Sequence, residues 1–441
     1  MPPRDIRNDL VDAVVLEVHG MVHDQGWLAD RALERVLRRE QRLYSTERRA
    51  AAEAAYGLTR WQGLLDWLLA GQKRDLTTRY AAWLTRFGGV RLQDAARRVG
   101  VAPSALAGVE HADERIAAIA DPVERLSVAE SLPSWIAERF ASELGLAEAQ
   151  ALAHCMNERA PLTVRTNLIK TTREDLRARL DHEGTRSEPT QLSPWGLQLD
   201  GHANAFALAS FQAGHFEIQD EGSQLVALAC AARPGQLVID ACAGAGGKSL
   251  ALAMEMHNKG SLVALDSDAD RLNEAKRRAR RAQVHNLRTR PIPAGPEAAA
   301  QLDDLAGKAD LILIDAPCSG LGTLRRKPDA RWRLRPEDPA RFAAIQGELA
   351  VRFARLVAPG GRLIYATCAI GHTENQDVAA KIPEQTGLSP FPLASLLGAE
   401  LAGRLGVGGP YTSGTEPNQL QLLPHRHQTD GFFLAAFERA R

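Results

Sequence analysis

From about residue 236 onward the chain repeats one local pattern, in which a short apolar strand leads through a turn into a helix. The strands contain the sequences QLVID, SLVALD, DLILID and GRLIYAT, and they are apolar almost throughout. Short strands of this kind are typical of a parallel sheet that is covered on both faces. Because strands and helices alternate, we predict a doubly wound α/β sheet, which binds ligands beyond the carboxyl ends of its strands.

The residues before this region have a different character. Up to about residue 140, apolar side chains recur at the three-four spacing of amphipathic helices, as in LVDAVVLEVHGMV. Residues 141–230 mix a short strand, in APLTVRTNLIK, with helical segments such as TTREDLRARLDHEG. We therefore predict three parts, namely an all-α domain over residues 1–140, a small α+β module over 141–230 and the doubly wound domain over 231–441.

Composition narrows the class of protein. The formal net charge is zero, so any contact with a polyanion has to come from local basic stretches. No run of 18 apolar residues occurs, which argues against a membrane span. The five cysteines are scattered without CxxC spacing, which argues against a disulfide scaffold and structural zinc and favours a reducing cytoplasm. We expect a cytoplasmic monomer without a metal or a membrane anchor.

The loop DACAGAGGKS after the first of these strands is a candidate ligand site, because its glycines allow a tight turn and close approach of the backbone to a ligand. A Walker A loop needs glycine where Cys242 stands, and a dinucleotide fingerprint needs glycine where Ser249 stands. The remaining interpretations are a structural turn and the first loop of an S-adenosyl-L-methionine methyltransferase. In the latter, Asp266 at the next strand end would bind the ribose hydroxyls, although it would also suit NAD. The cofactor-binding candidates are Asp240, Cys242, Ala243, Gly244, Ala245, Gly246, Gly247, Lys248, Asp266 and Asp315.

Two cysteines, Cys318 in DAPCSG and Cys368 in YATCA, follow two further strands. A thiol beside a methyl donor suggests one chemistry, in which a thiolate adds to carbon 6 of cytosine so that carbon 5 can accept a methyl group. An ordinary thiol is only slightly ionised near neutral pH, so the site has to favour the thiolate, and Lys248 could supply positive charge. Asp315 could contact the cytosine edge and favour the protonated ring nitrogen.

DAPCSGLGTLRRKPDARW, YATCA and DACAGAGGKS together resemble the NOL1/NOP2/sun family of RNA cytosine-5 methyltransferases, and the resemblance covers roughly residues 130–441. It implies a Rossmann-like methyltransferase domain that uses S-adenosyl-L-methionine. It also implies that Cys368, in a Thr-Cys motif, is the nucleophile and that Cys318, in a Pro-Cys motif, helps to release the product. The presence of both motifs favours RNA over DNA. The N-terminal part, with ERRAAAEAAYGLTRWQGLLDWLLAG, is similar to the NusB-like RNA-binding domain of a family member that acts on 16S rRNA, which implies an rRNA substrate.

A basic segment follows the Pro-Cys motif. Phosphate binding is the favoured interpretation, because a flipped base needs its flanking backbone held, and Trp332 would pack or stack there. A solvated loop is the alternative. The RNA-binding candidates are Arg325, Arg326, Lys327 and Arg331.

Three positions depart from the family pattern. Ala245 replaces a proline of the first loop, Ala369 replaces the serine after the nucleophile, and the strand end at PIPAGPEAAA lacks the Asp that often contacts the cofactor there. The missing acid near Pro293 supports one alternative, a non-catalytic RNA-binding assembly factor on the same fold. A tRNA is the alternative substrate, whereas the N-terminal domain and the Thr-Cys motif disfavour small molecules and DNA.

Overall fold

The computed structural model describes residues 6–70, 75–200, 203–407 and 416–441. The chain forms two compact units, of which the first contains Met1–Arg159 and Leu324–Pro336 and the second contains Ala160–Thr323 and Glu337–Arg441. The units differ from the three predicted parts, because position 140 falls inside helix α9 and because the α+β module and the doubly wound sheet share one unit. The sequence reasoning also missed the return of the chain to the first unit after Thr323.

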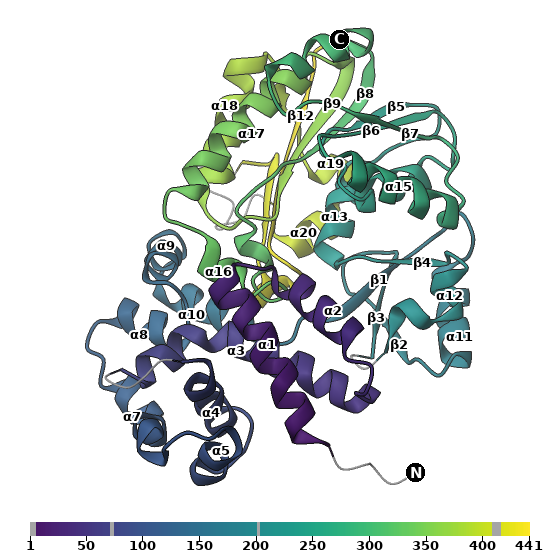
Figure 1. Cartoon of the computed structure of the whole chain (residues 1–441). Coiled ribbons are helices and arrows are strands. Elements are labelled where there is room, and N and C mark those ends of the chain that lie inside the picture. Colours follow the sequence, from purple (N-terminus) through teal and green to yellow (C-terminus); the bar gives the residue numbers. More distant parts are fainter. Residues whose placement is uncertain (1–5, 71–74, 201–202, 408–415) are drawn as a thin grey trace. The chain divides into compact units, whose positions relative to one another are not determined.

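The first unit is helical, as predicted (Figure 1). The three-four spacing near the N-terminus forms one buried helix face, on which Val11, Val14, Val15 and Val18 are each at most 3% exposed. The helices of Met1–Arg159 are α1 (Asn8–Gln25), α2 (Ala29–Arg39), α3 (Ser45–Leu68), α4 (Leu76–Arg86), α5 (Leu92–Val99), α6 (Ala107–Glu110), α7 (Ala112–Ala117), α8 (Pro122–Ala129), α9 (Ser134–Leu144) and α10 (Leu146–Cys155), with a 3-10 turn η1 (Pro103–Leu106).

The later segment of the first unit, Leu324–Pro336, carries the short helix α16 (Ala330–Arg333). The indole Nε1 of Trp332 donates a hydrogen bond to the carbonyl oxygen of Thr59 in α3 at 2.6 Å. Gly63 leaves room for the ring, because a Cβ there would stand 2.6 Å from Cη2 of Trp332. The segment is therefore part of the packed interior of the first unit.

The second unit contains a small antiparallel sheet with the strand order β2-β3-β1-β4. Leu176 and Leu180 of one helix and Phe211 of another pack with Val164 and Phe216 of the sheet in a core of its own. This is the predicted α+β module. Its elements are β1 (Leu162–Thr166), α11 (Arg173–His182), β2 (Ser187–Pro189), β3 (Gly196–Leu199), η2 (Ala205–Ala207), α12 (Ala209–Gln212) and β4 (Phe216–Ile218).

The larger sheet of the second unit has the strand order β10-β12-β9-β8-β5-β6-β7, and β11 pairs with β12. The strands from β5 to β9 are parallel, which confirms the predicted doubly wound sheet, whereas β12 runs antiparallel to β9. The strands are β5 (Leu237–Asp240), β6 (Ser261–Asp266), β7 (Leu287–Pro291), β8 (Ala309–Asp315), β9 (Val357–Thr367), β10 (Ser389–Pro390), β11 (Gln419–Leu422) and β12 (Phe432–Glu438).

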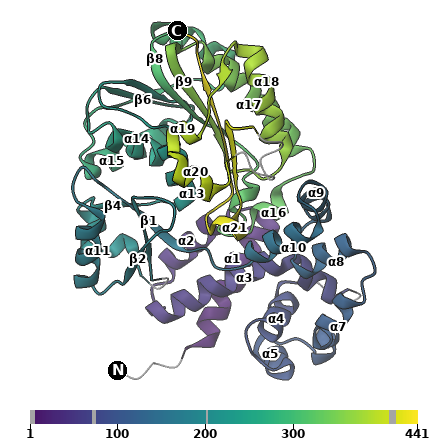
Figure 2. The same cartoon turned by 180° about the vertical axis from the view of Figure 1, so that it is seen from behind.

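Helices cover both faces of this sheet, which explains why its central strands are apolar throughout (Figures 1 and 2). Ile312 and Ile314 of β8 belong to the core that includes residues of α17 and α18, and Leu311 and Leu313 belong to the core that includes residues of α13, α14 and α15. The helices of this region are α13 (Glu221–Ala229), α14 (Gly247–Glu255), α15 (Ala269–Ala282), α17 (Asp338–Ala354), α18 (Gln376–Thr386), α19 (Ala394–Leu397), α20 (Ala399–Leu405) and α21 (Pro424–His427), with 3-10 turns η3 (Pro296–Ala298), η4 (Ala300–Leu305), η5 (Leu321–Thr323) and η6 (His372–Glu374). Within the described part of the chain, every helix is too short or too polar to cross a membrane.

Candidate active site

The candidate site lies at the carboxyl ends of three neighbouring strands in the second unit. Strand order reverses between β5 and β8, which is where doubly wound sheets bind ligands. Asp240 ends β5, Asp315 ends β8 and Thr367 ends β9, so the glycine loop and both cysteine motifs begin at one edge of the sheet. The structure therefore brings together the strand-end residues that the sequence predicted.

The glycines of the first loop have separate tasks. Gly244 and Gly246 have φ angles of +53° and +81°, which favour glycine. A Cβ at Gly246 would stand 2.8 Å from Cβ of Ala275, so this glycine allows α15 to pack closely, whereas a Cβ at Gly244 would meet nothing within 4 Å. The open side at Gly244 and the N-terminus of α14 at Gly247 leave backbone that can face a ligand carboxylate.

Two carboxylates hold the ends of this loop through hydrogen bonds. Asp266 accepts hydrogen bonds from the N–H of Gly244 at 2.7 Å and from the N–H of Asp268 at 2.9 Å, which ties the end of β6 to the loop. Asp240 is only 1% exposed, and it accepts a hydrogen bond from the Ser249 hydroxyl at 2.6 Å. Burial raises the pKa of Asp240 to about 7 despite that hydrogen bond. Asp240 therefore ties the end of β5 to the first turn of α14.

The donor set fits S-adenosylmethionine. Each Asp266 oxygen keeps acceptor capacity for a ribose hydroxyl, and the helix N-terminus at Gly247 suits the carboxylate of a methionine moiety. The loop positions from Cys242 to Lys248 would line such a ligand.

Lys248 and Asp315 form an ion pair next to the cysteines. Lys248 Nζ lies 2.7 Å from Asp315 Oδ2 and 4.9 Å from the ring centroid of Phe432. Burial favours the neutral amine, but the charge of Asp315 and its hydrogen bond outweigh burial, so the net effect raises the pKa of Lys248. Lys248 is therefore an ammonium group, and Asp315 keeps a second oxygen for another donor.

Cys318 and Cys368 face each other, with their Sγ atoms 3.1 Å apart. The N–H of Cys368 also donates to Cys318 Sγ at 3.3 Å. The hydrogen bond with Cys368, followed by burial, raises the pKa of Cys318 well above its usual range. Cys318 is therefore a neutral thiol in this arrangement, and it can hydrogen-bond to a thiolate at Cys368.

The predicted RNA-binding residues differ in how far their side chains are exposed to solvent. Arg331 is fully buried, its Nη1 donates to the carbonyl oxygen of Ser131 at 3.1 Å, and burial lowers its pKa to about 9. Arg325 is 6% exposed. A phosphate contact needs an accessible guanidinium group, so the predicted RNA contact by these two arginines disagrees with their placement. Arg326 is half-buried and Lys327 is exposed, and both stay candidates.

Sequence reasoning missed a buried polar network behind the cysteines. Glu374 and Asn375 are 2% and 0% exposed, and they hydrogen-bond to residues that flank the two cysteines. The only sequence signal was the position of a polar Glu-Asn pair soon after the strand that ends in Thr367.

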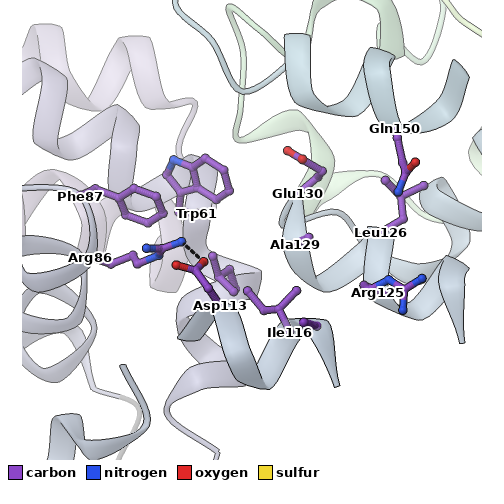
Figure 3. Close-up of a pocket in the computed structure, with 12 residues that line it drawn as sticks. Trp61, Arg86, Phe87, Asp113, Ile116, Arg125, Leu126, Ala129, Glu130 and Gln150 are labelled. Atoms are coloured by element: carbon purple, nitrogen blue, oxygen red, sulfur yellow. Dashed lines mark hydrogen bonds and ion pairs between the residues drawn. The ribbon is translucent and has the colours of Figure 1, made fainter. Parts of the chain in front are cut away.

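A separate cavity of about 360 Å³ lies within the first unit (Figure 3). Trp61 and Phe87 stack along its wall with ring centroids 4.6 Å apart, and Arg86 pairs with Asp113 beside them. Its aromatic and charged lining contains none of the predicted catalytic residues.

Comparison with known proteins agrees with this geometry. The family described as "16S rRNA methyltransferase RsmB/F" matches residues 227–438, and its "Methyltr_RsmF/B-like, ferredoxin-like domain" matches residues 132–205. A Bacillus subtilis protein named probable ribosomal RNA small subunit methyltransferase B is 34% identical over 73% of this chain and 69% of its own length. A Synechocystis protein of the same name is 30% identical over 93% of this chain and 95% of its own. The crystal structure of PH0851 superimposes with a TM-score of 0.78 over 99% of both chains at 24% identity, which supports the fold.

The sheet order, the glycine loop and the acid at the end of β6 define a Rossmann-like nucleotide-binding fold, and the family model over residues 227–438 identifies it as a methyltransferase. The sequence matches show which one: the chain belongs to the RsmB/F family of 16S rRNA methyltransferases. This result confirms the family and the fold class that the motifs predicted.

Proposed function

We propose that this chain is an S-adenosylmethionine-dependent RNA cytosine-5 methyltransferase that acts on rRNA of the small ribosomal subunit. The observation that carries the proposal is the pair of thiols, 3.1 Å apart, beside a carboxylate and an ammonium group. The names of the Bacillus and Synechocystis relatives support rRNA as the substrate.

The cofactor would be held by the glycine loop and Asp266, and it supplies an electrophilic methyl group when bound. The cytosine would sit between this loop and the thiols. The second oxygen of Asp315 would accept a hydrogen bond from the amino edge or the protonated ring nitrogen of the base, while Lys248 keeps Asp315 in place.

Cys368 begins the reaction as a thiolate. Its sulfur would form a bond to carbon 6, the electrons of the carbon 5–carbon 6 double bond would shift to form a carbon 4–carbon 5 double bond, and N3 would receive the displaced electron pair and take a proton from solvent. Carbon 5 would then take the methyl group, whose bond to the cofactor's sulfur breaks and leaves its electron pair on that sulfur. Loss of the carbon 5 proton returns the electron pair to the ring, the sulfur–carbon 6 bond breaks, N3 gives back its proton, and the Cys368 thiolate is restored.

Cys318 would accept the carbon 5 proton as a thiolate, after its own thiol proton has passed to solvent. In the free enzyme its hydrogen bond with Cys368 is the largest cause of its raised pKa. That cause disappears when the Cys368 sulfur is bonded to carbon 6, so Cys318 ionises more easily after the adduct has formed. The same pair of sulfurs therefore favours attack by Cys368 first and proton removal by Cys318 second.

The test is a pair of substitutions, with purified small-subunit rRNA and radiolabelled S-adenosylmethionine. Cys368→Ala should abolish methyl transfer, and retained turnover would refute the nucleophile assignment. Cys318→Ala should trap a covalent RNA–protein adduct on a denaturing gel, and lack of an adduct would remove the release role. Cys155→Ala, at a buried cysteine of the first unit, is the matched control and should behave as the wild type.

Two other functions remain distinguishable by experiment. Bisulfite sequencing of RNA from cells that lack the protein would separate an rRNA target from a tRNA target. A non-catalytic assembly factor, which the missing acid near Pro293 favours, predicts no binding of S-adenosylmethionine in calorimetry.

A further inference from the structure

Two consecutive residues of the second unit, Glu374 and Asn375, contact the two cysteine-bearing loops separately. Glu374 ends η6 and Asn375 precedes α18. Both side chains are buried, at 2% and 0% exposure. A buried carboxylate and a buried amide are costly unless their polar atoms are bonded, so their partners identify what they hold.

Glu374 holds the loop of Cys318. Its Oε1 accepts a hydrogen bond from the N–H of Ser319 at 2.8 Å, directly after the cysteine. Gln346 Nε2 lies 3.2 Å from the same oxygen and donates to the carbonyl oxygen of Pro317 at 2.9 Å, directly before the cysteine. The backbone on both sides of Cys318 is therefore fixed by Glu374 and its amide partner.

Asn375 holds the loop of Cys368 in the same manner. The hydroxyl of Thr367, directly before the cysteine, donates to Asn375 Oδ1 at 2.6 Å. Asn375 Nδ2 donates to the carbonyl oxygen of Ala369, directly after the cysteine, at 3.2 Å. The same Nδ2 lies 3.0 Å from Gln421 Oε1, which anchors the amide to β11.

Tyr365 joins this anchor to the sheet. It is fully buried in β9, and its hydroxyl lies 3.0 Å from Gln346 Oε1 and 2.5 Å from the carbonyl oxygen of Glu374. The positions of Glu374 and Asn375 are thus set by a strand that also delivers Cys368 to the site.

We infer that Glu374 and Asn375 are positioning residues, which together set the distance between the two thiols and keep each thiol in place for its own step. The inference rests on the proposed function for its catalytic consequence. Because each residue contacts a different loop, loss of Asn375 should affect bond formation by Cys368, and loss of Glu374 should affect release through Cys318.

The charge of Glu374 gives a second, independent expectation. After the hydrogen bond with Cys368 and burial, this carboxylate is a further cause of the raised pKa of Cys318. Glu374→Gln keeps an oxygen acceptor of similar shape but removes the negative charge. The variant should therefore shift the pH profile of adduct release toward lower pH, which a purely structural defect would not do.

Single-turnover assays on the full chain measure the two steps. With small-subunit rRNA and the cofactor, Asn375→Ala should slow adduct formation roughly 10–100-fold, the order expected for displacement of a reacting group by about 1 Å. Glu374→Ala should instead slow release by a similar factor, so that the adduct accumulates. Asn375→Asp and Glu374→Gln serve as conservative variants if the alanine variants do not fold.

The matched control is Gln376→Ala. Gln376 is the next residue, is 7% exposed, and its side-chain oxygen has no partner among the described residues. It should leave both steps near the wild-type rates. The inference is overturned if each Glu374 or Asn375 variant slows adduct formation and adduct release by the same factor, and if that factor only reflects the loss of folded protein.

A thiol assay separates failure of this inference from failure of the proposed function. Diamide oxidises two neighbouring thiols to a disulfide and is itself reduced to a hydrazine, and mass spectrometry then measures the Cys318–Cys368 cross-link without RNA. The wild type should cross-link at least ~10-fold faster than Glu374→Ala or Asn375→Ala, because the anchor sets the sulfur separation. Equal rates would refute the positioning role, whereas a wild type that cross-links but forms no RNA adduct would refute the proposed function alone.

Discussion

Gly322→Ala tests whether backbone packing keeps Cys368 in place. Gly322 lies between two backbone segments, since its N–H donates to the carbonyl oxygen of Cys368 at 2.9 Å and its own carbonyl oxygen accepts from the N–H of Gly431 at 2.8 Å. A Cβ at Gly322 would stand 2.2 Å from the carbonyl oxygen of Gly431 and 2.7 Å from that of Cys368. Both neighbours are backbone atoms, so a side-chain rotation cannot relieve the clash.

The size of the effect follows from these distances. Ordinary contact begins at 3.4 Å, so the Cβ would be too close to the Gly431 oxygen by about 1.2 Å and to the Cys368 oxygen by about 0.7 Å, and the Cys368 backbone has to move by about the latter amount. A displacement of this order costs about 100-fold in the rate of a step that needs aligned reactants. Overpacking of a core also costs roughly 1–3 kcal/mol of unfolding free energy.

The assay is the single-turnover rate of methyl transfer, with thermal unfolding followed in parallel. Gly347→Ala in α17 is the control, because a Cβ at Gly347 meets nothing within 4 Å. It should keep the wild-type rate and gain about 0.5–1 kcal/mol, as expected for replacement of a mid-helix glycine. If Gly322→Ala methylates RNA at the wild-type rate, the packing argument is wrong.

Two further predictions concern stability. In the folded protein the pKa of Asp240 is about 7, which is above the ordinary value of 3.8. The contribution of Asp240 to the free energy of unfolding is therefore fully present below pH 3.8 and is lost as pH rises through about 7. Asp240→Asn removes this dependence, and its melting temperature relative to the wild type should therefore rise between pH 5 and pH 8; an unchanged difference would contradict a raised pKa. Gly63→Ala places a methyl group 2.6 Å from the Trp332 ring and should destabilise the first unit by roughly 1–3 kcal/mol. The same change in a Trp332→Ala background should cost far less, and equal costs would show that the ring does not fill this space.

The sequence predicted the features that depend on local pattern. Apolar strands that end in Asp or Thr-Cys placed Asp315 and Cys368 at one sheet edge, because strand direction in a doubly wound sheet determines where strand ends meet. The burial of Arg331 was not predictable, since an arginine in a basic stretch is ordinarily solvated and its partner, Ser131, is distant in the sequence. Glu374 and Asn375 were missed for a related reason, because a polar pair in a turn shows no spacing that indicates partners on other elements.

The route of the chain through the two units has a consequence for how the protein is made. Leu324–Pro336 completes the first unit, but it is synthesised only after much of the second unit. During translation the nascent helices of the first unit cannot complete their packing until Trp332 has been synthesised. Until then the surface beside Gly63, which the Trp332 ring covers in the folded protein, stays exposed. A fragment that ends near residue 159 would share this defect, so expression of the N-terminal helices alone should give an aggregation-prone product unless the later segment is supplied in trans.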